Sequence, residues 1–147
     1  MTQENEANFN EMVKALTEAA GVEAMPSEDG RILFAIDDDL GVSIASADAE
    51  EVGSDIAIAS IVIGKAPDDT NALRALLEEN YLGIGSGNGA FSVEPESGAV
   101  VLYRVFPLPM DADEFVDAFS QLVGAGRDAK DHLANAESEP VAGGILV

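Results

Sequence analysis

Apolar and polar positions follow helical spacing near the start of the chain. Phe9, Met12 and Leu16 recur at intervals of three to four residues, while charged side chains occupy mostly other positions. This pattern predicts an amphipathic helix. Gly21 is expected to end that helix, because glycine accepts the left-handed backbone of a helix C-terminus.

Three stretches with the pattern of β-strands come next. Residues 32–36 and 40–44 alternate large apolar side chains with smaller ones, and residues 56–63 are rich in β-branched side chains. Asp29-Gly30 supplies a turn before the first strand. The three aspartates at 37–39 supply a turn between the first strand and the second. The simplest arrangement is three consecutive antiparallel strands.

The second half of the chain predicts a helix, a hairpin and a final helix. Residues 67–70 (Pro-Asp-Asp-Thr) have the composition of a helix start. Segments 90–94 and 99–107 are expected to pair across the turn 95–98 (Pro-Glu-Ser-Gly), and Asp111 is a candidate cap for the last helix. The predicted fold is α+β, an antiparallel β-sheet flanked by helices in the order α-β-β-β-α-β-β-α.

The length of 147 residues suits one domain with a single core. We assign residues 1–135 to this domain. Residues 136–147 contain glycine and proline and no periodic apolar face, so they are predicted to be a flexible tail.

Charge and composition narrow the classes of partner. Seven Lys and Arg against 28 Asp and Glu give a net charge of -21, which disfavours nucleic acid and anionic lipid. The charge either keeps the protein soluble or attracts a partner with basic segments. The chain has no cysteine, no signal-peptide pattern and no apolar run near the roughly 20 residues of a membrane helix. A cytoplasmic protein without membrane insertion is expected.

The glycine-rich segment 83–90 is the pattern closest to a cofactor site. Its residues from Gly85 to Ala90 fit G-x-G-x-x-A. A dinucleotide loop follows a strand and opens a helix, whereas this segment follows a predicted helix and enters a predicted strand. A flexible connector is the favoured interpretation, and no cofactor is predicted.

Acidic clusters offer oxygen ligands without a specific metal motif. The aspartates at 37–39 lack EF-hand spacing, and helix capping explains Asp111, Asp113 and Glu114. His132 lies in a polar stretch, where a surface role is expected. A pair of converging carboxylates remains open among so many acidic residues. With no P-loop, zinc-protease motif or nucleophile elbow, no catalytic residue and no metal ligand is predicted, and the protein is expected not to be an enzyme.

Two sets of apolar side chains are candidates for binding surfaces, and core packing is the alternative for both. The first could form a symmetric dimer interface and comprises Leu73, Leu76, Leu77, Tyr81, Phe91 and Val93. The second could line a groove for a partner's extended segment and comprises Phe9, Met12, Ile32, Phe34, Ile36 and Ile44. Strand alternation means that some members of the second set must point inward.

Four segments together have a recognisable order: LLEENYL, the glycine-rich link, FSVEPESGAVVLYRVFPL and DADEFVDAFSQLV. On these segments, and over roughly residues 5–133, the chain resembles the class I type III secretion chaperones of the CesT, or Tir chaperone, type. The small side chains Ala57, Ala59 and Ala66 and the expected interruption of the last helix at 124–126 depart from the family pattern.

The resemblance implies a homodimer in the bacterial cytoplasm. Such a dimer binds the N-terminal segment of a secreted effector, keeps it non-globular and soluble, and aids its delivery to the secretion apparatus. It also implies that the first apolar set forms the dimer interface and the second the client-binding groove. Two alternatives remain open, a regulatory or assembly adaptor of the same fold without a secreted client, and an acidic divalent-metal-binding or hydrolytic domain.

Overall fold

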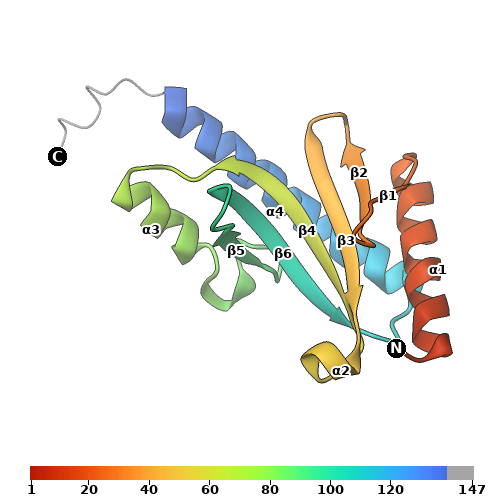
Figure 1. Ribbon diagram of the computed structural model, residues 1–147. Coiled ribbons are helices and arrows are strands. Elements are labelled where there is room, and N and C mark those ends of the chain that lie inside the picture. The colour runs from red at the N-terminus through yellow and green to blue at the C-terminus, as the bar shows by residue number, and fades with distance from the viewer. Residues whose placement is uncertain (139–147) are drawn as a thin grey trace.

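The protein is an antiparallel sheet of six strands with two long helices on one face (Figure 1). A computed structural model describes residues 1–138. The helices are α1 (Gln3–Ala20), α2 (Ala49–Val52), α3 (Thr70–Glu78) and α4 (Ala112–Ser138), with a 3-10 turn η1 (Tyr81–Gly83). The strands are β1 (Met25–Pro26), β2 (Ile32–Ile36), β3 (Leu40–Ala47), β4 (Ile56–Lys65), β5 (Ala90–Val93) and β6 (Ala99–Pro107).

The spatial order of the strands is β1-β2-β3-β4-β6-β5, and all neighbours are antiparallel. The predicted α+β class, the antiparallel sheet and the order of the major elements are confirmed. Three short elements, β1, α2 and η1, lie between the predicted ones. They were missed because elements of two to four residues carry too few side chains to show a period.

Polar side chains and one glycine fix helix ends, and two of them, Gly21 and Asp111, are the ones that the sequence predicts. The Oγ1 of Thr2 accepts a hydrogen bond from the Asn5 amide at 3.1 Å and caps α1, and Gly21 ends this helix with φ of 68°. Asp111 accepts hydrogen bonds from the amides of Asp113 and Glu114 and starts α4. These caps stabilise the helix ends by satisfying amides that have no partner within the helix.

The hairpin of β5 and β6 forms about the predicted turn. Gly98 adopts φ of 71°, a conformation that glycine reaches at little cost. The Glu94 carboxylate accepts hydrogen bonds from the amides of Glu96 at 3.1 Å and Ser97 at 2.7 Å. The turn is therefore held by its own side chains.

The core lies between one face of the sheet and the helices α1 and α4. Three phenylalanines build its centre, with the rings of Phe106 and Phe115 edge to face at 5.0 Å and those of Phe115 and Phe119 tilted at 6.1 Å. Met12 from α1 and Ile44 from β3 are completely buried beside them. In Figure 1, α4 runs behind the sheet and α1 stands at its β1–β2 side.

The last helix continues through residues 124–126, which corrects the expected interruption there. A Cβ on Gly126 would lie 3.4 Å from the Ile63 side chain, so this glycine sits where α4 approaches β4 closely. Packing on the sheet outweighs the roughly 1 kcal/mol that each helical glycine costs.

α4 extends to Ser138, three residues past the predicted domain boundary at 135, and the division into a domain and a tail stays a prediction. The rest of the predicted flexible tail, 139–147, lies outside the described residues. No helix within residues 1–138 combines the length and apolar character needed to cross a membrane.

Candidate binding surfaces

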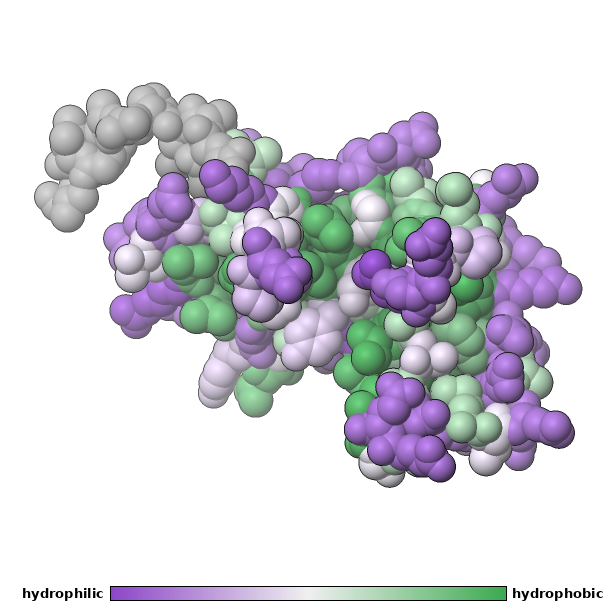
Figure 2. All heavy atoms as spheres, viewed as in Figure 1, coloured by the Kyte–Doolittle hydropathy of each residue, from purple (hydrophilic) through white to green (hydrophobic). Residues whose placement is uncertain are grey.

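The face of the sheet turned away from α1 and α4 carries apolar side chains. Strand pairing places Ile58 opposite Val105 and Val62 opposite Val101 on this side. We call it the open sheet face, and define it by Leu33, Ile58, Val62, Val101, Tyr103 and Val105. Val62 is 50% exposed and Val105 is 46% exposed. In Figure 2 hydrophobic residues gather across the middle of the molecule, in front of α4.

An antiparallel sheet with one face in water normally alternates apolar and polar side chains. Here β4 is mostly apolar on both faces, since Ala57, Ala59 and Ile61 point to the core while Ile58 and Val62 point away from it on either side of Ser60. A gathering of exposed apolar side chains of this kind marks a site of association. The open sheet face is therefore a candidate interface.

A second group of exposed apolar side chains lies on α3 and the turn that follows it. Leu77, Tyr81, Leu82 and Ile84 are each more than 60% exposed. Helical geometry separates Leu77 from its neighbour Leu76, which is only 9% exposed and packs in the core. One side of α3 thus belongs to the fold and another is free to bind.

The predicted dimer set divides in the same way. Leu77, Tyr81 and Val93 are exposed, and Leu73 is partly exposed. Leu76 and Phe91 are buried in the core, at 9% and 4% exposed, so in this structure they can supply little contact area to a second copy. The assignment of the exposed members to a dimer interface stays a prediction.

The predicted groove set lies mainly inside the protein. Phe9, Met12, Phe34 and Ile44 belong to the core between the sheet and the helices. Ile32 and Ile36 pack against that core and remain partly exposed. Ile32, Phe34 and Ile36 alternate along β2 and share its core-facing side, and only Ile32 and Ile36 keep partial exposure, so they are the members a client could reach.

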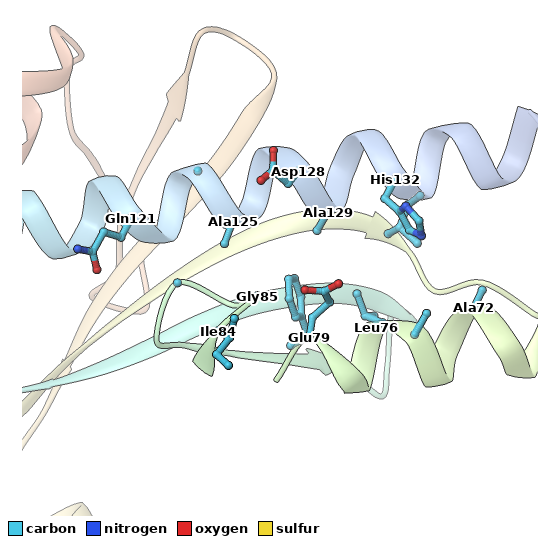
Figure 3. A pocket seen from close by; sticks show the side chains of 15 residues that line it. Ala72, Leu76, Glu79, Ile84, Gly85, Gln121, Ala125, Asp128, Ala129 and His132 are labelled. Atoms are coloured by element: carbon cyan, nitrogen blue, oxygen red, sulfur yellow. The ribbon is translucent and has the colours of Figure 1, made fainter. Parts of the chain in front are cut away.

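The structure contains a groove that the sequence did not predict, between α3 and α4. It has a volume of about 590 Å³. Figure 3 shows Ala125 and Ala129 of α4 on one wall and, on the other, Leu76 of α3 and Glu79, which directly follows this helix. We call it the α3–α4 groove, and its lining residues are Ala72, Ala75, Leu76, Glu79, Ile84, Gly85, Gly87, Phe91, Gln121, Gly124, Ala125, Asp128, Ala129, His132 and Leu133.

The glycine-rich segment is tightly packed at the end of this groove, which corrects its interpretation as a flexible connector. A Cβ on Gly89 would lie 2.4 Å from the Tyr103 carbonyl oxygen, and one on Gly87 would lie 2.7 Å from the Gln121 carbonyl oxygen. Ser86 is fully buried and donates a hydrogen bond to the Gly89 carbonyl at 2.7 Å. Glycine is needed here for close approach of backbones.

The acidic turn at 37–39 faces cations of α4. The Arg127 guanidinium lies 2.5 Å from the Asp37 carboxylate and 3.5 Å from that of Asp39, and Lys130 donates to the Asp39 carbonyl. Among residues 1–138, no three acidic or His side chains are placed to hold a metal ion together. His132 is exposed at the edge of the α3–α4 groove, as its polar surroundings in the sequence predict.

Three carboxyl groups with lowered pKa hold turns and helix starts. The hydrogen bond from Asn5 is the main cause that lowers the pKa of Asp55, and the amide of Ala49 at the start of α2 adds to it. Hydrogen bonds from Ser97 lower the pKa of Glu94, and a hydrogen bond from Ser27 lowers that of Asp29. Each of these groups stabilises local structure.

Comparison with known proteins identifies the family. The model of the Tir chaperone protein (CesT) family matches residues 11–130. The chain belongs to this family. No curated protein matches its sequence.

Three solved structures share the fold of this family member at low sequence identity. The HopA1–SchA chaperone–effector complex contains a chain with a TM-score of 0.66 and 12% identity, over 89% of this chain and 99% of that one. A chain of the ExsC–ExsE complex has a TM-score of 0.62 and 16% identity, over 89% of this chain and 96% of that one. The structure of the Yersinia pestis type III secretion chaperone SycH, bound to a stable fragment of YscM2, contains a chain with a TM-score of 0.60 and 16% identity, over 83% of this chain and 98% of that one.

Proposed function

We propose that this family member is a type III secretion chaperone that acts as a homodimer in the bacterial cytoplasm. It binds the N-terminal segment of a secreted effector, keeps that segment non-globular and soluble, and aids its delivery to the secretion apparatus. It does so by binding, without catalysing a reaction. The observation that carries the proposal is the fold of the family combined with exposed apolar side chains on the sheet face turned away from α1 and α4.

The open sheet face supports the dimer. A symmetric interface uses the same patch on both chains, so exposed Val62, Tyr103 and Val105 would meet their symmetry mates. Burial of this apolar area supplies the driving force for association. The exposed side of α3, with Leu77 and Tyr81, adds further apolar area.

Client binding follows from the same physical chemistry. An unfolded segment gains strand pairing and buried apolar anchors, and two equivalent sites in a dimer raise the effective concentration along one wrapped chain. The net charge of -21 keeps the complex soluble and speeds capture of basic client segments. Ile32 and Ile36, the partly exposed members of the predicted groove, are the candidate contacts on the α1 side.

Co-expression with the protein encoded beside this gene tests the proposal. We expect the neighbour to be retained on an affinity-tagged copy of this chain, and to be lost when its own N-terminal segment is deleted. A neighbour that is retained equally well without that segment would contradict the proposed function and favour an adaptor of the same fold.

A further inference from the structure

The α3–α4 groove combines small and apolar side chains on its walls. Small side chains line it on both sides, Ala72 and Ala75 from α3 and Ala125 and Ala129 from α4, so another chain can approach both helices. Leu76 and Phe91 add larger apolar side chains to the lining. The α3 side of the groove is short, since this helix has nine residues and is about 13 Å long, which suits a short segment of a partner.

Charge at the groove indicates the sign of that partner. Glu79 extends its carboxylate between the two helices, above Gly85 (Figure 3), and Asp128 lies on the α4 side. None of the lining residues is Lys or Arg, in a protein with a net charge of -21. Apolar walls with acidic side chains favour a segment that carries aliphatic side chains next to Lys or Arg.

We propose that the α3–α4 groove binds a client segment in which leucine-like side chains are flanked by Lys or Arg. The inference rests on the proposed function, because it names the chemistry of one segment that the chaperone holds. The aliphatic side chains enter between α3 and α4 and contact Ile84, which is 79% exposed at the groove. The basic side chains lie against Glu79 and Asp128.

A peptide-binding experiment with matched variants tests the site. The probe is a short fluorescein-labelled peptide in which leucine pairs alternate with lysines, titrated with the full chain and followed by fluorescence anisotropy. Ala125→Phe fills the groove and should abolish saturable binding. Ala134→Phe adds the same ring on an exposed position of α4 outside the groove and should bind as the wild type does.

Charge reversal at Glu79 tests the contribution of this side chain separately from the effect of the protein's net charge. Glu79→Lys should weaken binding about fivefold or more, because it replaces an exposed ion pair by a repulsion. Glu11→Lys makes the same change of net charge on α1 and should have little effect. Equal weakening by the two variants would show attraction to the net charge alone and would overturn the site.

Other occupants and a failure of the proposed function give different results. If Ala125→Phe turns a dimer into a monomer, the groove is covered by a second copy and the inference is wrong. If Ala125→Phe loses the peptide but retains the client on co-purification, the inference is wrong and the chaperone function stands. A wild type that binds the peptide and retains no client refutes the proposed function, and with it the identification of the segment as a client.

Discussion

Replacing Leu77 with aspartate tests whether the exposed side of α3 is buried between two copies of the chain. Leu77 is 62% exposed, whereas the adjacent Leu76 is 9% exposed. The substitution therefore places a charge on the surface of the monomer, where single changes alter the free energy of unfolding by about 0.5 kcal/mol or less. Any larger effect must come from association.

The size of that effect follows from the exposed fraction. Complete burial of a leucine side chain stabilises by about 1.5–3 kcal/mol, so burying the remaining 62% in an interface contributes about 1–2 kcal/mol. Two-fold symmetry counts the contact twice, which gives about 2–4 kcal/mol and a rise in the dimer Kd of about thirtyfold to several hundredfold. Desolvation of the new carboxylates adds to this loss.

Light scattering over a dilution series measures the dimer Kd, and urea unfolding measures the stability of the chain. Ala7→Asp is the matched control, because it adds the same charge at an exposed position of α1 and should leave the dimer intact. Leu76→Asp should instead prevent stable folding, because its charge would enter the core. If Leu77→Asp dimerises as tightly as the wild type, α3 is not part of the interface and the reasoning fails.

Three further predictions concern stability. Gly89→Ala should lower the free energy of unfolding by about 2 kcal/mol, since its Cβ would lie 2.4 Å from the Tyr103 carbonyl oxygen. The control Gly41→Ala adds a Cβ that meets nothing within 4 Å, so it should be neutral in the same urea titration. Equal effects of the two substitutions would contradict the close approach at Gly89. Asp55→Asn should destabilise the protein at pH 7 and destabilise it less at pH 3. The pKa of this carboxyl is lowered below its ordinary 3.8, so the carboxyl stabilises the fold above pH 3.8 and loses that contribution as the pH falls through the folded pKa. An equal loss of stability at the two pH values would refute this role. Asp111→Ala removes the cap of α4 and should cost about 1 kcal/mol by thermal melting, with Asp111→Ser recovering most of it; a melting temperature unchanged by Asp111→Ala would show that the cap is not needed.

Much of the fold could be predicted because it is encoded locally. The turn at 95–98 holds its own hydrogen bonds through Glu94, and Gly21 and Asp111 mark helix ends by their own backbone or side-chain chemistry. Such signals depend on a few neighbouring residues, so the sequence displays them. The alternation in β2, β3 and β4 similarly fixes which residues share a face.

The binding surfaces were harder to predict because they depend on where the elements pack. Periodicity grouped Leu76 with Leu77 on one face of α3, yet only the position of α3 beside α4 buries the first and exposes the second. Phe34 and Ile44 showed an apolar face of the sheet without showing that α1 and α4 cover it. The apolar side chains on both faces of β4 were the signal that could have indicated the open sheet face.

The glycine-rich segment 83–90 shows that composition alone also fails to predict packing. Many glycines in succession are typical of flexible linkers. Here Gly87 and Gly89 are required by the carbonyl groups of Gln121 and Tyr103, which are distant in the sequence. Close approach between remote backbones leaves no local pattern, so only the folded arrangement shows why these positions are glycine.

The mass of the complex between this chain and its client tests the central claim most directly. Light scattering on the co-purified complex, with the client's N-terminal segment as the only client part present, should give two copies of this chain and one client segment. A complex with one copy of this chain, or a dimer that retains no client segment, would contradict the proposed chaperone.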